Sequence, residues 1–148
     1  MPEIKQVIAA SLDGEDHFLE FFNNSGGSLS HGDVVVFDPS NVPGKYGKTT
    51  TAQYNHAVMG VVYDPAGSGV ADQATGVLRK RGFQNVNHGL AKYTNVGTFF
   101  VTSTTVKTCQ SITASTSLTT YAGAYIGRNV AAKTSTSVTT LQMFVDVE

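Results

Sequence analysis

Residues 23–36, which read NNSGGSLSHGDVVV, constrain the fold of this chain more than any other stretch. The glycine, serine and asparagine residues favour a turn, and Leu29 stands among them as an isolated apolar plug. The run at 34–37 is apolar without alternation, which predicts a strand covered on both faces. The residues of the stretch indicate a structural role, since they contain no nucleophile motif, metal-binding cluster or phosphate-binding loop. It therefore predicts a small β-fold.

Further short segments along the chain have the same strand-like character. The last of them alternates cleanly, so Leu141, Met143, Val145 and Val147 are expected on one face. Gly60 interrupts another segment and indicates a bulge or a close backbone approach. Seven or more short strands separated by Gly, Pro and Asn predict an all-β fold, either a small barrel or a sandwich. The expected strands are 17–23, 32–38, 57–63, 75–83, 97–102, 125–130 and 141–147.

The length of 148 residues fits an N-terminal arm over 1–16 and a single β-domain over 17–148. In the arm, Ile4, Val7 and Ile8 have the spacing of a short helix, and an extended arm lying on a neighbour is equally compatible.

Two other stretches stand out by composition. The polar stretch 40–55 is expected to be a long loop, which usually has a function or is mobile. The Thr-rich stretch 102–120 predicts extended, half-exposed strands. Such strands suit pairing within an oligomer, and a surface without a partner is the alternative.

Composition excludes several classes of protein. Eleven acidic and ten basic residues leave a net charge of −1, which does not favour binding to nucleic acid or to an anionic membrane. Only 14% of the residues are charged, against roughly 25% in typical soluble domains, and burial in an assembly would suit so weakly charged a surface. Cys109 is the single cysteine, so no internal disulfide forms and a reducing compartment is expected. Neither a signal-peptide run nor a membrane-spanning apolar run is present.

No motif for a cofactor or a metal emerges. Residues 44–49 (GKYGKT) resemble the end of a phosphate-binding P-loop, but Val42 occupies the position of its first glycine and a strand-like segment follows instead of a helix. The histidines lack the close spacing of a metal pair. His31 and His56 could converge with Cys109 in a pocket, although polar loop histidines and a buried thiol are the ordinary interpretation. We therefore expect no enzyme activity, no cofactor and no metal.

Three aspartates flank the expected strands. Asp33, Asp38 and Asp64 are of the type that caps turns by accepting hydrogen bonds from backbone amides.

The one basic cluster is Arg79-Lys80-Arg81. On a regular strand Arg79 and Arg81 share one face and Lys80 takes the other. Two arginines without interleaved aromatic residues are a weak signal for nucleic acid. We predict that they form salt bridges to an adjacent subunit, with an ordinary solvated strand face as the alternative.

The order of these segments resembles a known family. The pattern at 24–36, followed by VMGVV at 58–62, GTFFV at 97–101, IGRNV at 126–130 and a Val-x-Val terminus, is similar to small virion proteins of tailed bacteriophages. The nearest group is the capsid decoration, or cement, proteins with a compact β-barrel ("tulip") domain. The resemblance covers 17–148 and departs from the family in 40–55 and 102–120.

The resemblance implies a protein that is made in the host cytoplasm and added to the outside of a capsid shell. Such proteins often form homotrimers, bridge neighbouring major capsid proteins, and reach across with an N-terminal arm. The expected partner contacts are Pro2, Ile4, Val7, Ile8, Arg79 and Arg81. The alternatives are another phage head-fibre or tail component and, from a different class, a small β-barrel ligand-binding module.

Overall fold

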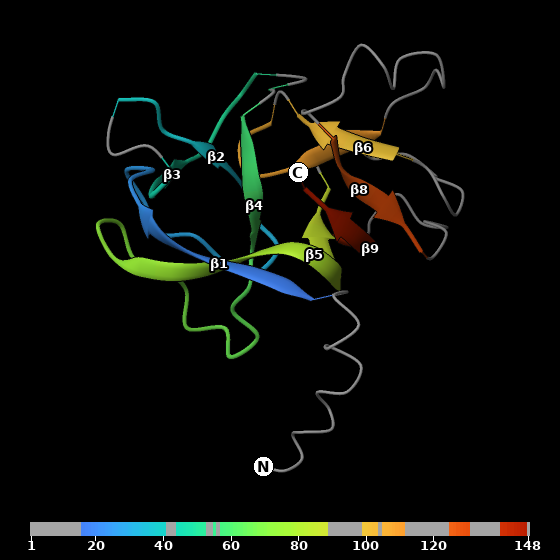
Figure 1. Cartoon of the computed structure of the whole chain (residues 1–148), viewed down its shortest axis with the longest axis horizontal. Helices are drawn as coiled ribbons and strands as arrows, with labels where there is room; N and C mark the ends of the chain where they lie inside the picture. Colours follow the sequence, from blue (N-terminus) through green and yellow to red (C-terminus); the bar gives the residue numbers. More distant parts are fainter. Residues whose placement is uncertain are drawn as a thin grey trace.

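The computed structural model describes residues 16–40, 44–52, 55, 57–88, 99–103, 105–111, 125–130 and 140–147. Within these residues the chain is all-β, with nine strands and no helix (Figure 1). The strands are β1 (His17–Asn23), β2 (Val34–Phe37), β3 (Tyr46–Lys48), β4 (Val58–Val62), β5 (Thr75–Asn87), β6 (Phe99–Thr102), β7 (Cys109–Ser111), β8 (Tyr125–Asn129) and β9 (Thr140–Asp146). The predicted fold class is confirmed.

Five strands close into a barrel in the order β1-β3-β2-β4-β5, because β5 also pairs with β1. The β1–β3 pair is parallel and the other pairs in the barrel are antiparallel. β3 lies inside the stretch 40–55, which was predicted to be one long loop, so that prediction is corrected. Three residues are too few for a periodic signal, and β3 is held by pairing with strands on both sides.

The other four strands continue from the second half of β5 in the order β9-β8-β6-β7. β5 is the longest strand and joins the two parts of the sheet, as Figure 1 shows. A single parallel bridge between His88 and Cys109 connects β7 back to the residue that follows β5. The strand expected at 75–83 is longer than predicted, and its extra residues 84–87 extend the pairing with β9 that begins at Arg81.

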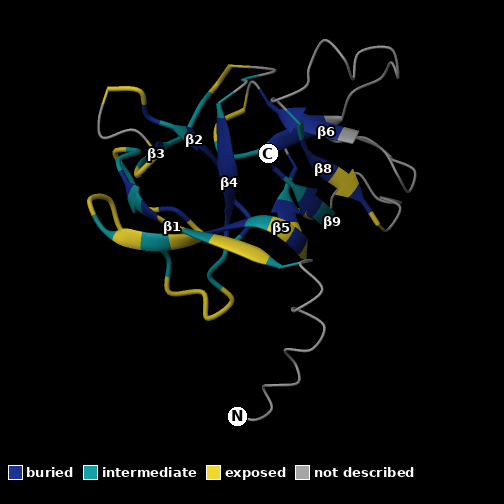
Figure 2. Ribbon diagram, in the orientation of Figure 1, coloured by how far each residue is buried: buried dark blue, intermediate teal, exposed yellow. Residues whose placement is uncertain are grey.

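Two hydrophobic cores lie on opposite faces of β2 and β4. Val35 and Val62 pack inside the barrel, whereas their neighbours Val34 and Val61 pack into the core formed with β6, β8 and β9. All residues of β4 are buried, and the strand is dark along its length in Figure 2. This arrangement confirms that the unalternating apolar run at 34–37 is covered on both faces.

The turn after β1 is closed by two buried residues. Leu29 is fully buried in the barrel core and forms an isolated bridge with Val70, as expected of a plug. Asn23 is also fully buried, and its Nδ2 donates to the backbone oxygens of Gly27 and Val70, both at 2.9 Å. These bonds tie the turn to the loop that precedes β5.

Gly60 in β4 lies at a bulge and at a close backbone approach, as its position in the sequence indicated. The β2–β4 register shifts between Val35 and Val36, which leaves one extra β4 residue there. A Cβ atom on Gly60 would lie 3.0 Å from the carbonyl oxygen of Arg79. Glycine is the residue that this approach between β4 and β5 accommodates.

Candidate interaction surface on strands β5, β9 and β8

A bulge separates the two arginines of the basic cluster. His17 and Phe18 are neighbours on β1, yet they lie opposite Arg81 and Arg79, so β5 has one residue more than β1 at Lys80. Successive side chains on β1 point to opposite faces of the sheet. The extra residue in β5 therefore places the side chains of Arg79 and Arg81 on opposite faces as well. The prediction that Arg79 and Arg81 share one face is therefore wrong.

The guanidinium of Arg79 is engaged within the chain. Its Nη1 forms an ion pair with the carboxylate of Asp16, and its Nε donates to Oε1 of Gln84 at 3.1 Å. Its Cζ lies 4.8 Å from the ring centroid of Phe18 and 5.0 Å from that of Tyr63, which is cation–π geometry. Arg79 is only 7% exposed. In the folded chain it stabilises the start of β1, and it presents little surface to a partner.

Arg81 is exposed and begins a row of cross-strand pairs between β5 and β9. Its Nε lies 3.8 Å from Oδ1 of Asp146, the residue directly opposite. The next outward pair is Phe83 and Phe144, whose ring centroids are 5.0 Å apart. The Cζ of Arg81 also lies 5.6 Å from the ring centroid of Phe144. The charged pair and the aromatic pair therefore form one continuous patch.

β8 extends this patch on the other side of β9. Arg128 is exposed and lies opposite Phe144 in the β8–β9 pairing. Among the described residues, no carboxylate lies within ion-pair distance of Arg128. Arg81, Phe83, Arg128, Phe144 and Asp146 are together called the aromatic–arginine face below.

The ionisation of Tyr125 on β8 depends on the charges of this face. Burial raises the pKa of the Tyr125 hydroxyl, Arg128 lowers it, and Asp146 raises it. The neutral phenol is therefore the form present at physiological pH. Tyr125 therefore adds an uncharged aromatic group that interacts with Arg128 and Asp146 of the face.

The composition of the face suits contact with another protein. Phe83 is 51% exposed, the largest exposed fraction among the large apolar side chains described. Arginine and aromatic side chains are the types enriched at the energetic centres of protein interfaces. Phe83 and the half-buried Phe144 place two aromatic rings side by side on the outer face of this sheet, and contiguous apolar surface of this kind often marks an interaction site.

Cys109 offers no reactive thiol. It is fully buried in the core formed with β6, β8 and β9, and its Sγ lies 4.0 Å from Sδ of Met143. Burial strongly raises the pKa of the thiol. His31 lies in the turn before β2, where its Nδ1 accepts a hydrogen bond from the Asp64 amide at 2.9 Å. His56 lies outside the described residues.

The other candidate sites in the sequence have structural roles. Asp33, Asp38 and Asp64 accept hydrogen bonds from backbone amides in turns, as predicted. The P-loop-like stretch forms a turn and β3 instead of the helix start that a phosphate cradle needs. In the part of the chain that the structure describes, no group of His, Cys, Asp and Glu is placed to hold a metal ion, and no helix there is long and apolar enough to cross a membrane.

A pocket of about 140 Å³ opens where β1, β3 and β5 meet. Lys45 and Glu20 bring opposite charges to it, and Phe22 and Tyr46 contribute a ring pair with centroids 4.8 Å apart. Among the described residues, its lining contains no histidine or cysteine.

The predicted contact residues in the arm, Pro2, Ile4, Val7 and Ile8, lie outside the described residues. Sequence reasoning missed the aromatic–arginine face, although one signal was present. The alternation that buries Leu141, Met143, Val145 and Val147 also turns Phe144 outward, and a phenylalanine on the polar face of a strand indicates a contact surface. Neither a family model nor a curated protein sequence matches this chain.

Proposed function

We propose that this chain is a non-enzymatic structural virion protein of a tailed phage. In this proposal it binds the outside of the capsid shell as a homotrimer and stabilises the shell by bridging neighbouring major capsid proteins. The protein is made in the host cytoplasm and needs no cofactor, nucleic acid or membrane. The aromatic–arginine face is the observation that carries the proposal, because exposed aromatic and arginine side chains are the types enriched where proteins contact one another.

The fold supports this role in a second way. The five-strand barrel has no open edge, and β5 continues from it into the sheet part where β9 and β8 carry the rest of the face. Such a scaffold presents a contact face in a fixed shape, so little conformational entropy is lost when the face is covered. Repeated contacts over a lattice add by avidity, and binding to the assembled shell raises the free energy of its disassembly.

The charge pattern of the face sets the expected partner surface. Arg81 shares its charge with Asp146 across an exposed pair, whereas Arg128 adds a second positive charge beside the aromatic rings. A shell surface with carboxylates around an apolar centre is complementary to this arrangement. Because both arginines are exposed, binding should weaken as the salt concentration rises.

The test mixes the purified chain with assembled capsid shells of the phage that encodes it. Stoichiometric cosedimentation and a higher disruption temperature of the shells support the proposal. Phe83→Ala should weaken binding at least tenfold, whereas Val106→Ala, which also truncates an exposed apolar residue, should leave binding unchanged. Shells that bind none of the protein overturn the proposal, and location on the tail by electron microscopy assigns it to another virion part.

A further inference from the structure

The pocket where β1, β3 and β5 meet is built on a row of side chains on the outer face of the barrel. Phe22 on β1 lies opposite Tyr46 on β3 and opposite Thr75 on β5, and all three line the pocket. A Cβ atom on Gly47, the residue after Tyr46, would lie 3.0 Å from the ring of Phe21 in the barrel core. Because successive side chains alternate, the row formed by residues 46, 22 and 75 points outward.

Two half-buried aromatic rings contribute to the lining of this pocket. The ring centroids of Phe22 and Tyr46 are 4.8 Å apart, and the ring planes are tilted by 41°. Aromatic rings attract cations through the negative charge of their faces, and quaternary ammonium groups are recognised in this way. The pocket has a volume of about 140 Å³. Since a cavity of roughly 150 Å³ holds a benzene ring, the pocket takes one group of that size, such as a trimethylammonium group.

Glu20 and Lys45 bring a negative and a positive charge to the same pocket, and both residues are exposed. In the part of the chain that the structure describes, neither side chain has an ion-pair or hydrogen-bond partner. The two charges therefore do not neutralise each other, although they line one pocket. A ligand that carries both signs of charge is complementary to this arrangement.

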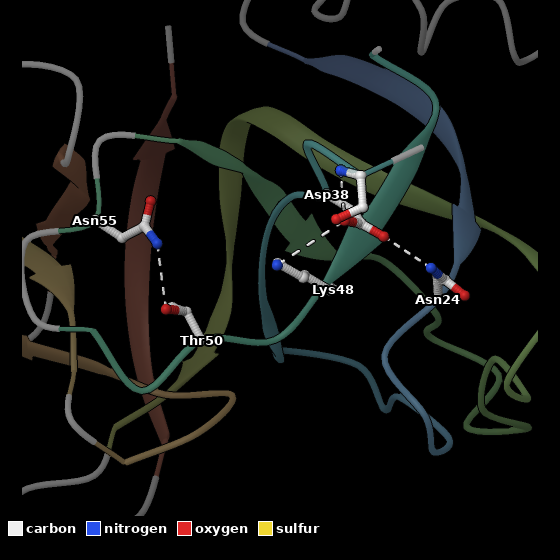
Figure 3. Close-up of polar contacts among 6 residues, drawn as sticks. Asn24, Asp38, Lys48, Thr50 and Asn55 are labelled. Carbon is white, nitrogen blue, oxygen red and sulfur yellow. Dashed lines mark hydrogen bonds and ion pairs between the residues drawn. The ribbon is translucent and has the colours of Figure 1, made fainter. Parts of the chain in front are cut away.

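The other lysine on this segment shows the contrast (Figure 3). Nζ of Lys48 lies 3.9 Å from Oδ1 of Asp38, whose Oδ2 accepts a hydrogen bond from Nδ2 of Asn24 at 2.7 Å. Asp38 is only 5% exposed, so Lys48 has a structural partner within the chain. Lys48 also does not line the pocket. Of these two lysines, Lys45 is therefore the one whose charge is available to a ligand.

We propose that this pocket binds a small zwitterion in which an alkylated ammonium is joined to a phosphate or a carboxylate, as in phosphocholine. The ammonium group lies against the rings of Phe22 and Tyr46 and is attracted by the Glu20 carboxylate, and the anionic group faces Lys45. A neutral ligand would leave both charges without compensation when they lose water, whereas a zwitterion compensates each of them. The pocket shares no residue with the aromatic–arginine face, so this inference is independent of the proposed function.

Titration of the purified full chain with phosphocholine, followed by backbone amide chemical shifts, tests the site. Phosphocholine should give saturable shifts at residues 20, 22, 45, 46 and 75. It should bind about fivefold more tightly than choline or inorganic phosphate alone, because each of these supplies only one of the two charges. Methyl glucoside, a neutral ring compound, should bind more weakly than phosphocholine.

Single variants separate the two halves of the ligand. Lys45→Met should weaken phosphocholine binding about fivefold without weakening choline binding, whereas Glu20→Gln should weaken both about fivefold. Lys48→Met is the matched control, since it removes a lysine charge outside the pocket and should leave both affinities unchanged. Tyr46→Leu should weaken both ligands, whereas Tyr46→Phe keeps the ring and should bind as the wild type does. Thermal unfolding checks that each variant is folded.

Shifts that do not saturate, or that are confined to residues outside the pocket, overturn the proposal. Methyl glucoside binding as tight as that of phosphocholine overturns it as well, because a neutral ring does not use the two charges. Once free phosphocholine binds, vesicles identify the source of the group. Cosedimentation with phosphatidylcholine vesicles but not with phosphatidylglycerol vesicles assigns it to a lipid headgroup, and no cosedimentation with either assigns it to a soluble molecule.

Discussion

Phe83 and Phe144 lie directly opposite each other on β5 and β9, with ring centroids 5.0 Å apart and ring planes at 63°. The pair points away from both hydrophobic cores, since neither residue belongs to them. Edge-to-face aromatic pairs contribute stability beyond their buried area. The same two rings therefore stabilise the β5–β9 pairing and form the centre of the aromatic–arginine face.

A double-mutant cycle should measure that coupling. Phe83→Ala, Phe144→Ala and the double variant, compared with the wild type by urea unfolding, are expected to give an interaction free energy of about 0.5–1.5 kcal/mol. All four proteins should fold, because the cores are untouched. A coupling energy of zero would show that the rings contact each other without stabilising the sheet.

Gly127 should be intolerant of any side chain. A Cβ atom there would collide with the Phe144 carbonyl oxygen and would lie 3.0 Å from the Cα of Val145. Both atoms belong to the β9 backbone and cannot rotate away, so Gly127→Ala should cost about 3 kcal/mol of unfolding free energy. Gly27→Ala is the control, since no described atom lies within 4 Å of the added Cβ. Equal stability of the two variants would contradict the close approach of β8 and β9.

Arg79 and Arg81 should differ in their effect on stability. Arg79→Met leaves Asp16 and Gln84 without their partner and removes the cation–π contacts, so a loss of about 2–3 kcal/mol is expected. Arg81→Met removes an exposed ion pair and an exposed contact with the Phe144 ring, and should cost less than about 1 kcal/mol. Chemical unfolding of both variants in the same buffer makes the comparison. The opposite order would mean that Arg79 is not engaged within the chain.

Cys109 should make the protein less stable at alkaline pH. Burial raises the thiol pKa in the folded state, whereas the thiol of an unfolded chain ionises near pH 8.5. Above that pH the unfolded state binds fewer protons, so the unfolding free energy falls by up to about 1.4 kcal/mol per pH unit. Below it the contribution is fully present.

Urea unfolding of the wild type and Cys109→Ala between pH 7 and pH 10 measures the effect as a difference in slope. Cys109→Ala is less stable at neutral pH because it leaves a cavity, but it should lack the alkaline decline attributable to the thiol. Parallel slopes for the two proteins would exclude Cys109 as the cause.

Much of the fold was predictable from local patterns. The unalternating run at 34–37 indicated two covered faces, and the alternation at 141–147 identified its four buried residues. Leu29 was recognisable as a plug because it is apolar within a polar turn. These features depend on side-chain direction along one strand, which has a fixed period of two.

The groups of residues that meet on the surface could not be predicted from any single strand. The pairing of Phe83 with Phe144, the bulge at Lys80 and the convergence of Asn24, Asp38 and Lys48 all depend on register between segments distant in sequence. A shift of one residue in register would turn each of these side chains to the other face.

Local patterns were therefore enough to predict an all-β chain and some of its core residues. The assignment of outward residues to shared surfaces required the folded chain, because closure of β1 on β5 and the pairing of β5 with β9 select one register among many. Core burial depends on each strand separately, whereas a site depends on which strands become neighbours.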